Sequence, residues 1–151
     1  MGKVTLVMMA GLPGTGKSTL ALEIGKVLGW PVIDKDTMKT SLLESGIVEQ
    51  IAAGLAYELT FALAQDILVR QQRSLIIDTP LTYLSTLLKG QQLAESTQAH
   101  LRIILCQCTD ELRDRRMQDR PPRASQPGNL SSQGGNPNVR FEHVPEEKLV
   151  L

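Results

Sequence analysis

The sequence predicts an α/β fold in which a parallel β-sheet lies between two layers of helices. Apolar runs of strand length alternate along the chain with segments of helical periodicity, and this alternation is typical of a parallel sheet. The first run, 4–10, is apolar on both faces, which favours a strand buried inside the sheet. A length of 151 residues suits one compact domain with one core.

The individual elements follow from the periodicity and from the turn residues between them. We expect strands at 4–10, 30–33, 74–77 and 101–106, the start of another at 148–151, and helices at 19–29, 37–44, 47–72, within 83–97 and at 110–120. One face of the first helix would carry Leu20, Ile24, Val27 and Leu28, and the long helix spaces Ile51, Leu55, Leu59 and Leu63 four apart. Gly54 inside that helix indicates a bend or a close packing contact.

Composition disfavours several classes of protein. Sixteen basic and sixteen acidic residues cancel, so no overall field attracts nucleic acid or an anionic membrane, and 3% aromatic residues offer little base stacking. Apolar stretches look shorter than the roughly 20 residues that cross a bilayer, and no signal peptide precedes the first strand. Cys106 and Cys108 favour a reduced pair over a redox or metal site. We therefore expect a cytoplasmic protein with neither a membrane nor a nucleic acid as its partner.

A glycine-rich loop follows the first strand. Residues 11–18 read G-L-P-G-T-G-K-S and match G-x-x-x-x-G-K-[ST] at every fixed position. Such glycines let the backbone turn its N–H groups toward one concavity, and the following helix adds the positive end of its dipole. Lys17 would reach the β- and γ-phosphates of ATP, and Ser18 would offer a hydroxyl to Mg²⁺. The alternative is a glycine turn that binds nothing.

The expected nucleotide-binding residues are those of the loop and its first helical positions. They are Gly11, Leu12, Pro13, Gly14, Thr15, Gly16, Lys17, Ser18 and Thr19.

With this loop, the segment L-G-W-P-V-I-D-K-D at 28–36 and the arginines after the fourth strand, the chain resembles a group of small P-loop kinases. This AAA-type predicted kinase group includes shikimate, gluconate and nucleoside monophosphate kinases, chloramphenicol phosphotransferase and polynucleotide kinase-like enzymes. The resemblance runs from Val4 to about Arg120. GTPases are less similar, because no N-K-x-D guanine motif occurs.

The resemblance implies an α/β, three-layer P-loop NTPase fold with a parallel sheet, C-terminally incomplete. The family continues past a fifth strand into a loop that packs on the adenine and a final helix, whereas this sequence ends at Leu151. Its shikimate kinases also carry a glycine triplet and a substrate arginine that this sequence does not show, which argues against shikimate as acceptor.

Two aspartates close the second strand. Carboxylates near a Mg²⁺-triphosphate can hold metal-bound water and accept a proton from an acceptor hydroxyl. The resemblance implies that Asp36 is the base, since Lys39 follows three residues later as a basic residue does in polynucleotide kinase-like enzymes, and that Asp34 belongs to the outer shell of the metal. The alternative for Asp36 is a helix N-cap.

Asp78 ends the third strand and resembles the Walker B carboxylate that holds the Mg²⁺ shell. The alternative is a turn residue before Thr79 and Pro80. Because ligands of parallel sheets bind beyond the carboxyl ends of the strands, we expect Lys17, Asp36 and Asp78 to converge at one edge.

A basic cluster follows the fourth strand and comprises Arg113, Arg115, Arg116, Arg120 and Arg123. Arg116 and Arg120 are four apart and share a helix face. The resemblance implies that they are lid arginines that neutralise the transferring phosphate, with Arg113 and Arg115 on the surface. A solvated face paired with Asp114 and Asp119, or a nucleic-acid patch, are the alternatives.

Composition changes after this helix. Residues 121–138 are rich in Pro, Gly, Ser, Asn and Gln, and they cannot form a core. Within one domain, 1–151, we expect a mobile lid or linker at about 121–143. A lid would close over bound nucleotide and exclude water, and Arg123 could move with it.

These features predict an ATP-dependent phosphotransferase that uses Mg²⁺ and moves the γ-phosphate of ATP to a hydroxyl of a small molecule. The catalytic residues would be Lys17, Asp36, Arg116 and Arg120, and the metal residues Ser18, Asp34 and Asp78. The alternative is a nucleotide-binding or ATP-hydrolysing module without transfer activity.

Overall fold

A computed structural model describes residues 2–125, and the structural statements below concern this range. Its elements, in chain order, are β1 (Thr5–Ala10), α1 (Lys17–Leu28), β2 (Val32–Asp34), α2 (Lys35–Glu44), α3 (Glu49–Val69), β3 (Leu75–Asp78), α4 (Leu84–Thr97), β4 (His100–Leu105) and α5 (Asp110–Gln118). The predicted order of strands and helices is confirmed over this range, with boundaries that differ by a few residues. The strand expected at 148–151 lies outside the described residues.

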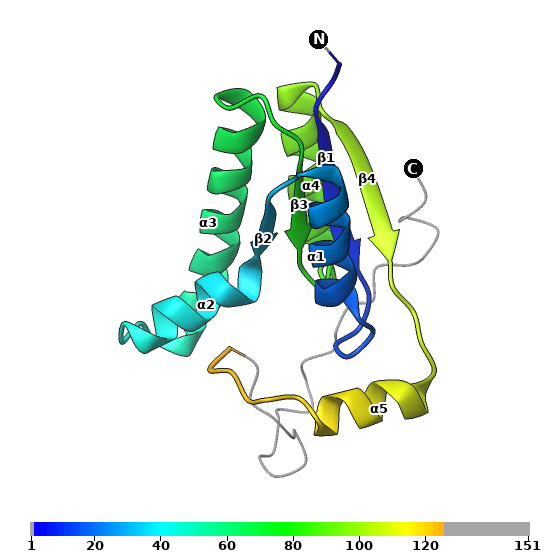
Figure 1. The fold of residues 1–151 in the computed structure, drawn as a ribbon. Coiled ribbons are helices and arrows are strands. Elements are labelled where there is room, and N and C mark those ends of the chain that lie inside the picture. Colours follow the sequence, from blue (N-terminus) through cyan, green and yellow to red (C-terminus); the bar gives the residue numbers. More distant parts are fainter. Residues whose placement is uncertain (1, 126–151) are drawn as a thin grey trace.

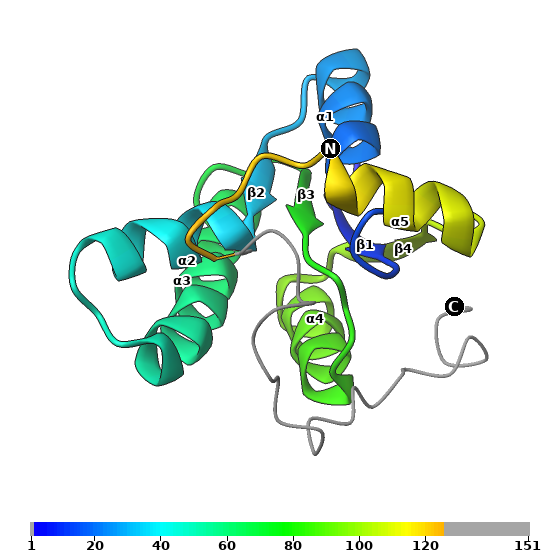
Figure 2. The same ribbon diagram turned by 90° about the horizontal axis from the view of Figure 1, so that it is seen from below.

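The four strands form one parallel sheet in the order β2-β3-β1-β4. Helix α1 covers one face, whereas α3 and α4 cover the other, as Figures 1 and 2 show. Helix α5 lies beyond the carboxyl ends of β1 and β4, and α2 directly follows β2 (Figure 2). The predicted three-layer α/β fold is therefore confirmed.

Alternate residues of the central strands point to opposite faces of the sheet. In β1, Leu6 and Met8 belong to the core cluster beneath α3 and α4, whereas Val7 and Met9 pack with Ala21 of α1. All four strand side chains are buried, at 5% exposure or less. A strand that is apolar on both faces is thus covered on both faces, as the sequence predicts.

Helices α1 and α3 contact the sheet mainly through small side chains, and most of the large residues on their predicted apolar faces are exposed. Of the predicted face of α1, Leu20, Val27 and Leu28 are exposed, and only Ile24 packs against the core. The buried side of this helix carries Ala21 and Gly25. Helix α3 repeats the pattern over most of its length, with Ile51, Leu55, Leu59 and Leu63 exposed and Ala52, Ala56, Thr60 and Ala64 buried. Its last turns also bury Ile67 and Leu68.

Close approach explains the choice of small residues. A Cβ atom on Gly25 would stand 2.7 Å from Val32 Cγ2 and 2.9 Å from the carbonyl oxygen of Trp30, so α1 rests directly on the β2 side of the sheet. Gly54 in α3 behaves differently from our expectation. Helix α3 runs unbroken through it, and a Cβ atom there would meet nothing within 4 Å.

The length and apolar composition of α3 also correct a sequence expectation. This 21-residue helix has a window of mean hydropathy 1.3, so length and composition alone would permit it to cross a membrane. Core helices of other domains pass the same test, and α3 packs against α2, α4 and β3.

The two helical glycines predict opposite responses to alanine. Gly54→Ala should raise the free energy of unfolding by about 0.5–1 kcal/mol, because it gains helix propensity in open space. Gly25→Ala should lower the free energy of unfolding by about 1–3 kcal/mol, because the new methyl group meets backbone.

Urea denaturation of both variants at one pH measures the two changes. Each variant controls for the other, since both exchange the same atoms in a helix interior. A stabilised Gly25→Ala variant would contradict the close helix–sheet contact.

Candidate functional site

The loop between β1 and α1 runs through left-handed backbone at three glycines. The φ angles are 129° at Gly11, 83° at Gly14 and 93° at Gly16, a region that other residues rarely adopt. A side chain on Gly11 would also collide with the carbonyl oxygen of Cys106, which follows β4. The Thr15 hydroxyl closes the loop by donating to the carbonyl of Leu12 at 2.8 Å.

Lys17, the first residue of α1, lies almost fully buried in this loop, with 9% exposure. Its Nζ donates to the carbonyl oxygen of Leu12 at 2.9 Å. Burial lowers the pKa of Lys17, and the nearby Asp78 carboxylate opposes that effect. A buried ammonium at a helix N-terminus is well placed to bind an anion.

Asp78 is the acidic partner of this loop. It ends β3, is 6% exposed and accepts a hydrogen bond from the Ser18 side chain. Burial raises the pKa of Asp78, while the hydrogen bond from Ser18 and the charge of Lys17 lower it. One hydroxyl and one carboxylate thus meet beside the loop.

The Ser18 hydroxyl and the Asp78 carboxylate fit Mg²⁺ better than they fit a metal ion whose ligands all come from the protein. The described residues contain no group of three or more His, Cys, Asp or Glu side chains that could cage an ion. Mg²⁺ usually takes one or two protein oxygens and completes its shell with water and phosphate. The adjacent Thr79 hydroxyl is buried without a partner in the described part of the chain, so an oxygen ligand in this cleft could satisfy it.

A cleft of about 920 Å³ joins these groups to the rest of the predicted site. Its walls include Lys17, Ser18, Asp36, Asp78, Arg116 and Arg120. The predicted convergence of Lys17, Asp36 and Asp78 at the carboxyl edge of the sheet is confirmed. Asp34, in contrast, is not among the residues that line the cleft.

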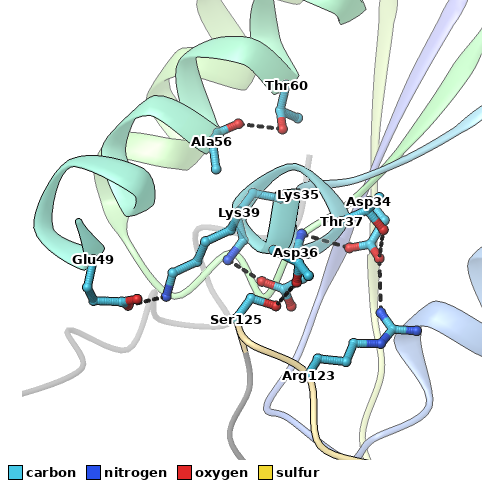
Figure 3. Close-up of polar contacts among 11 residues, drawn as sticks. Asp34, Lys35, Asp36, Thr37, Lys39, Glu49, Ala56, Thr60, Arg123 and Ser125 are labelled. Atoms are coloured by element: carbon cyan, nitrogen blue, oxygen red, sulfur yellow. Dashed lines mark hydrogen bonds and ion pairs between the residues drawn. The ribbon is translucent and has the colours of Figure 1, made fainter. Parts of the chain in front are cut away.

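Asp34 is the N-cap of α2, the role that we considered for Asp36. Its Oδ1 accepts from the backbone N–H of Asp36 at 2.8 Å, and its Oδ2 accepts from the Thr37 hydroxyl at 2.8 Å (Figure 3). Because β2 ends at Asp34 and α2 starts at Lys35, strand alternation does not continue to Asp36. The alternative that Asp36 caps the helix is therefore wrong, and the Asp36 carboxylate does not serve as the N-cap.

Helix α5 lies against the loop. Arg116 Nη1 lies 3.4 Å from the carbonyl oxygen of Gly14. Arg113, which we expected at the surface, packs its side chain against Gly14 and pairs with Asp110 at 3.0 Å. The sequence does not indicate that Arg113, among the arginines of α5, contacts the glycine loop. The packing of α5 against the loop determines which face of the helix meets it.

The segment after α5 crosses to α2, as Figure 2 shows. Arg123 Nη1 lies 3.4 Å from Asp34 Oδ2 (Figure 3). The Thr40 hydroxyl donates to the Ser125 hydroxyl at 2.8 Å. The beginning of the predicted lid or linker, 121–125, therefore contacts the acidic end of β2. The rest of that predicted segment lies outside the described residues.

Comparisons with known proteins identify a family and a shared fold. Residues 6–133 match the model of a protein family described as AAA domain. No curated protein matches the chain.

Solved structures share the fold, among them the following three. A candidate kinase from Chloroflexus aurantiacus j-10-fl is 23% identical, with a TM-score of 0.70 over 80% of this chain and 68% of that one. The APS kinase CysC of Mycobacterium tuberculosis, solved with AMPPNP and APS, is 16% identical, with a TM-score of 0.61 over 77% and 69%. A gluconokinase from Sinorhizobium meliloti 1021 is 17% identical, with a TM-score of 0.52 over 80% and 67%.

The burial of Asp78 predicts a pH-dependent stability difference. Because the pKa of Asp78 is raised above its ordinary 3.8 in the fold, the wild-type chain loses stability as pH rises through the folded pKa. Asp78→Asn removes that loss, so without Mg²⁺ or nucleotide the variant should melt at a higher temperature than wild type at neutral pH.

Thermal melts between acidic and neutral pH, with EDTA present, measure the difference. The advantage of the variant should shrink as pH falls and Asp78 becomes protonated. An Asp78→Asn variant that is less stable at neutral pH would show that the carboxylate is stabilised in the fold.

Proposed function

We propose, since the chain belongs to the AAA domain family, that it is an ATP-dependent phosphotransferase that moves the γ-phosphate of ATP to a hydroxyl of a small molecule. The observation that carries the proposal is the single cleft shared by Lys17, Ser18, Asp78 and Asp36. Groups that could bind phosphate and groups that could activate an acceptor thus line the same cleft.

The glycine loop would hold the triphosphate. Residues 11–19 provide backbone N–H groups and the N-terminus of α1, and Lys17 would exchange its bond to the Leu12 carbonyl for the β- and γ-phosphates. Ser18 and Asp78 would hold Mg²⁺, directly and through water, and Asp34 would contribute at most through the outer shell. The metal ion would neutralise charge on the phosphates during transfer.

Asp36 and the two arginines would act on the reacting groups. The Asp36 carboxylate would accept the proton of the acceptor hydroxyl. Arg116 and Arg120 would neutralise charge on the transferring phosphoryl group, since both line the cleft. Positioning and charge neutralisation are the main contributions that a protein makes to phosphoryl transfer.

The structural relatives support a small acceptor. APS kinase was solved with a nucleotide analogue and a small-molecule ligand, and gluconokinase has the same fold. We extend that class of ligand to this chain as part of the proposal. Free thiols at Cys106 and Cys108 fit a reducing compartment, so we place the protein in the cytoplasm.

Replacement of Lys17 tests the nucleotide site. Lys17→Ala should weaken binding of ATP·Mg²⁺ by about 10- to 100-fold, because charge-assisted bonds to phosphate are lost. Isothermal titration calorimetry measures the affinity, and Lys26→Ala, an exposed position on the same helix, is the matched control. Equal affinity of the Lys17→Ala and wild-type chains would exclude this nucleotide site.

The acceptor is tested with ATP·Mg²⁺ and a panel of nucleosides, sugars, sugar acids, aminoglycosides and phenicols. A phosphorylated product, detected by mass spectrometry, identifies a kinase, and Asp36→Asn should reduce its formation while ATP binding persists. Phosphate release without any phosphorylated product would instead identify an ATP-hydrolysing module.

A further inference from the structure

Lys35 is a buried lysine whose position is costly. It is 9% exposed, and lysine side chains are almost never so buried unless a partner compensates. It is also the first residue of α2, where the helix dipole disfavours a positive charge. Neither burial nor helix position stabilises the Lys35 ammonium, so its contacts with other side chains must compensate for the cost.

Two contacts hold the Lys35 ammonium. Its Nζ lies 2.5 Å from Asp36 Oδ1, and it stands over the Tyr57 ring at 5.3 Å from the centroid. Tyr57 belongs to α3, so the ammonium connects the start of α2 with the next helix. An aromatic face and a carboxylate together can hold a desolvated cation in one place.

The pairing of Lys35 with Asp36 does not follow from their adjacency. Consecutive residues of a helix point in different directions and do not ordinarily face each other. Here both side chains turn to the same point, beside the N-terminus of α2 (Figure 3). The Lys35 ammonium thus contacts both the Tyr57 ring of α3 and the Asp36 carboxylate of α2.

The consequence is an Asp36 carboxylate with one oxygen held and one available. Oδ1 is bound to Lys35, and the described residues offer Asp36 no other side-chain partner. Asp36 lines the cleft with Lys17 and Asp78, whereas Lys35 is not part of the cleft wall. Lys35 therefore binds Asp36 Oδ1 from outside the cleft wall, and Asp36 Oδ2 remains available to a ligand in the cleft.

We propose that Lys35, fixed by the Tyr57 ring, is a positioning residue that aims the Asp36 carboxylate at the acceptor hydroxyl. This inference rests on the proposed function, because it assigns Lys35 a role only through Asp36. It also gives each residue of the D-K-D sequence at the end of β2 a role. Asp34 caps α2, Lys35 orients the Asp36 carboxylate, and Asp36 accepts the proton of the acceptor hydroxyl.

Lys89 provides a matched control. Its ammonium pairs with the carboxylate of Glu58 and stands over the Phe61 ring at 6.0 Å from the centroid. Like Lys35, it contacts one carboxylate and an aromatic ring that belongs to α3, but it lies in α4 and does not line the cleft. A general loss of packing around α3 would affect both positions, whereas only Lys35 contacts Asp36.

The test is a double-mutant cycle with ATP·Mg²⁺ and water as the acceptor, measured as phosphate release. Lys35→Met should lower kcat by about 10-fold or more, a cost typical of a misplaced catalytic group, with ATP affinity unchanged. Lys35→Arg, which keeps the charge, should recover most of the activity, and Lys89→Met should stay near wild type. In an Asp36→Asn background, Lys35→Met should cause no further loss.

Additive losses in the cycle, or equal losses for Lys35→Met and Lys89→Met, would overturn the inference. If the Asp36→Asn variant loses activity and the Lys35→Met variant keeps full activity, only the role of Lys35 is overturned. A fully active Asp36→Asn overturns the proposed role of Asp36, and that of Lys35 falls with it.

Crystal structures of the wild-type and Lys35→Met chains provide a measurement independent of turnover. The Asp36 carboxylate should change its rotamer in Lys35→Met while α2 and Tyr57 stay in place. An unchanged Asp36 rotamer would show that the lysine does not orient it.

Discussion

The left-handed backbone at Gly11, Gly14 and Gly16 is the constraint on which the rest of the site depends. Only glycine adopts these angles without strain, and the lack of a side chain at Gly11 lets the Cys106 carbonyl come close. That contact brings the connection from β4 to α5 against the loop. The Gly11 N–H also donates to the Pro80 carbonyl at 3.2 Å, which joins the segment after β3 to the same point. Residues far apart in sequence therefore meet around one turn.

Burial of opposite charges is the second feature of the site. Lys17 and Asp78 are both largely removed from water, and burial disfavours the charged form of each, as the shifts of their pKa values indicate. Such desolvated groups in a cleft are typical of functional sites, although structural ion pairs show them too. A bound triphosphate and its metal ion would bring the matching charges, so ligand binding and the stability of the loop should be coupled.

Much of this arrangement could be predicted because it depends on local pattern. The loop motif specifies its own backbone, and the carboxyl ends of parallel strands must share an edge, which placed Asp36 and Asp78 near Lys17. The helix faces could not be predicted from large apolar residues, because contact with the sheet at Gly25 and Ala21 requires small ones. The roles of Asp34 and Asp36 depend on where β2 ends, because the residue between the strand and α2 becomes the helix N-cap. The contact of Lys35 with Tyr57 joins two helices and has no local signal.

The most direct measurement is a crystal structure of the chain with AMPPNP and Mg²⁺. The β- and γ-phosphates should lie in the glycine loop within hydrogen-bond distance of Lys17, with Mg²⁺ beside Ser18 and Asp78. The γ-phosphate should face Asp36 across the space left for an acceptor. A nucleotide bound elsewhere, or a γ-phosphate directed away from Asp36, would contradict phosphoryl transfer in this cleft.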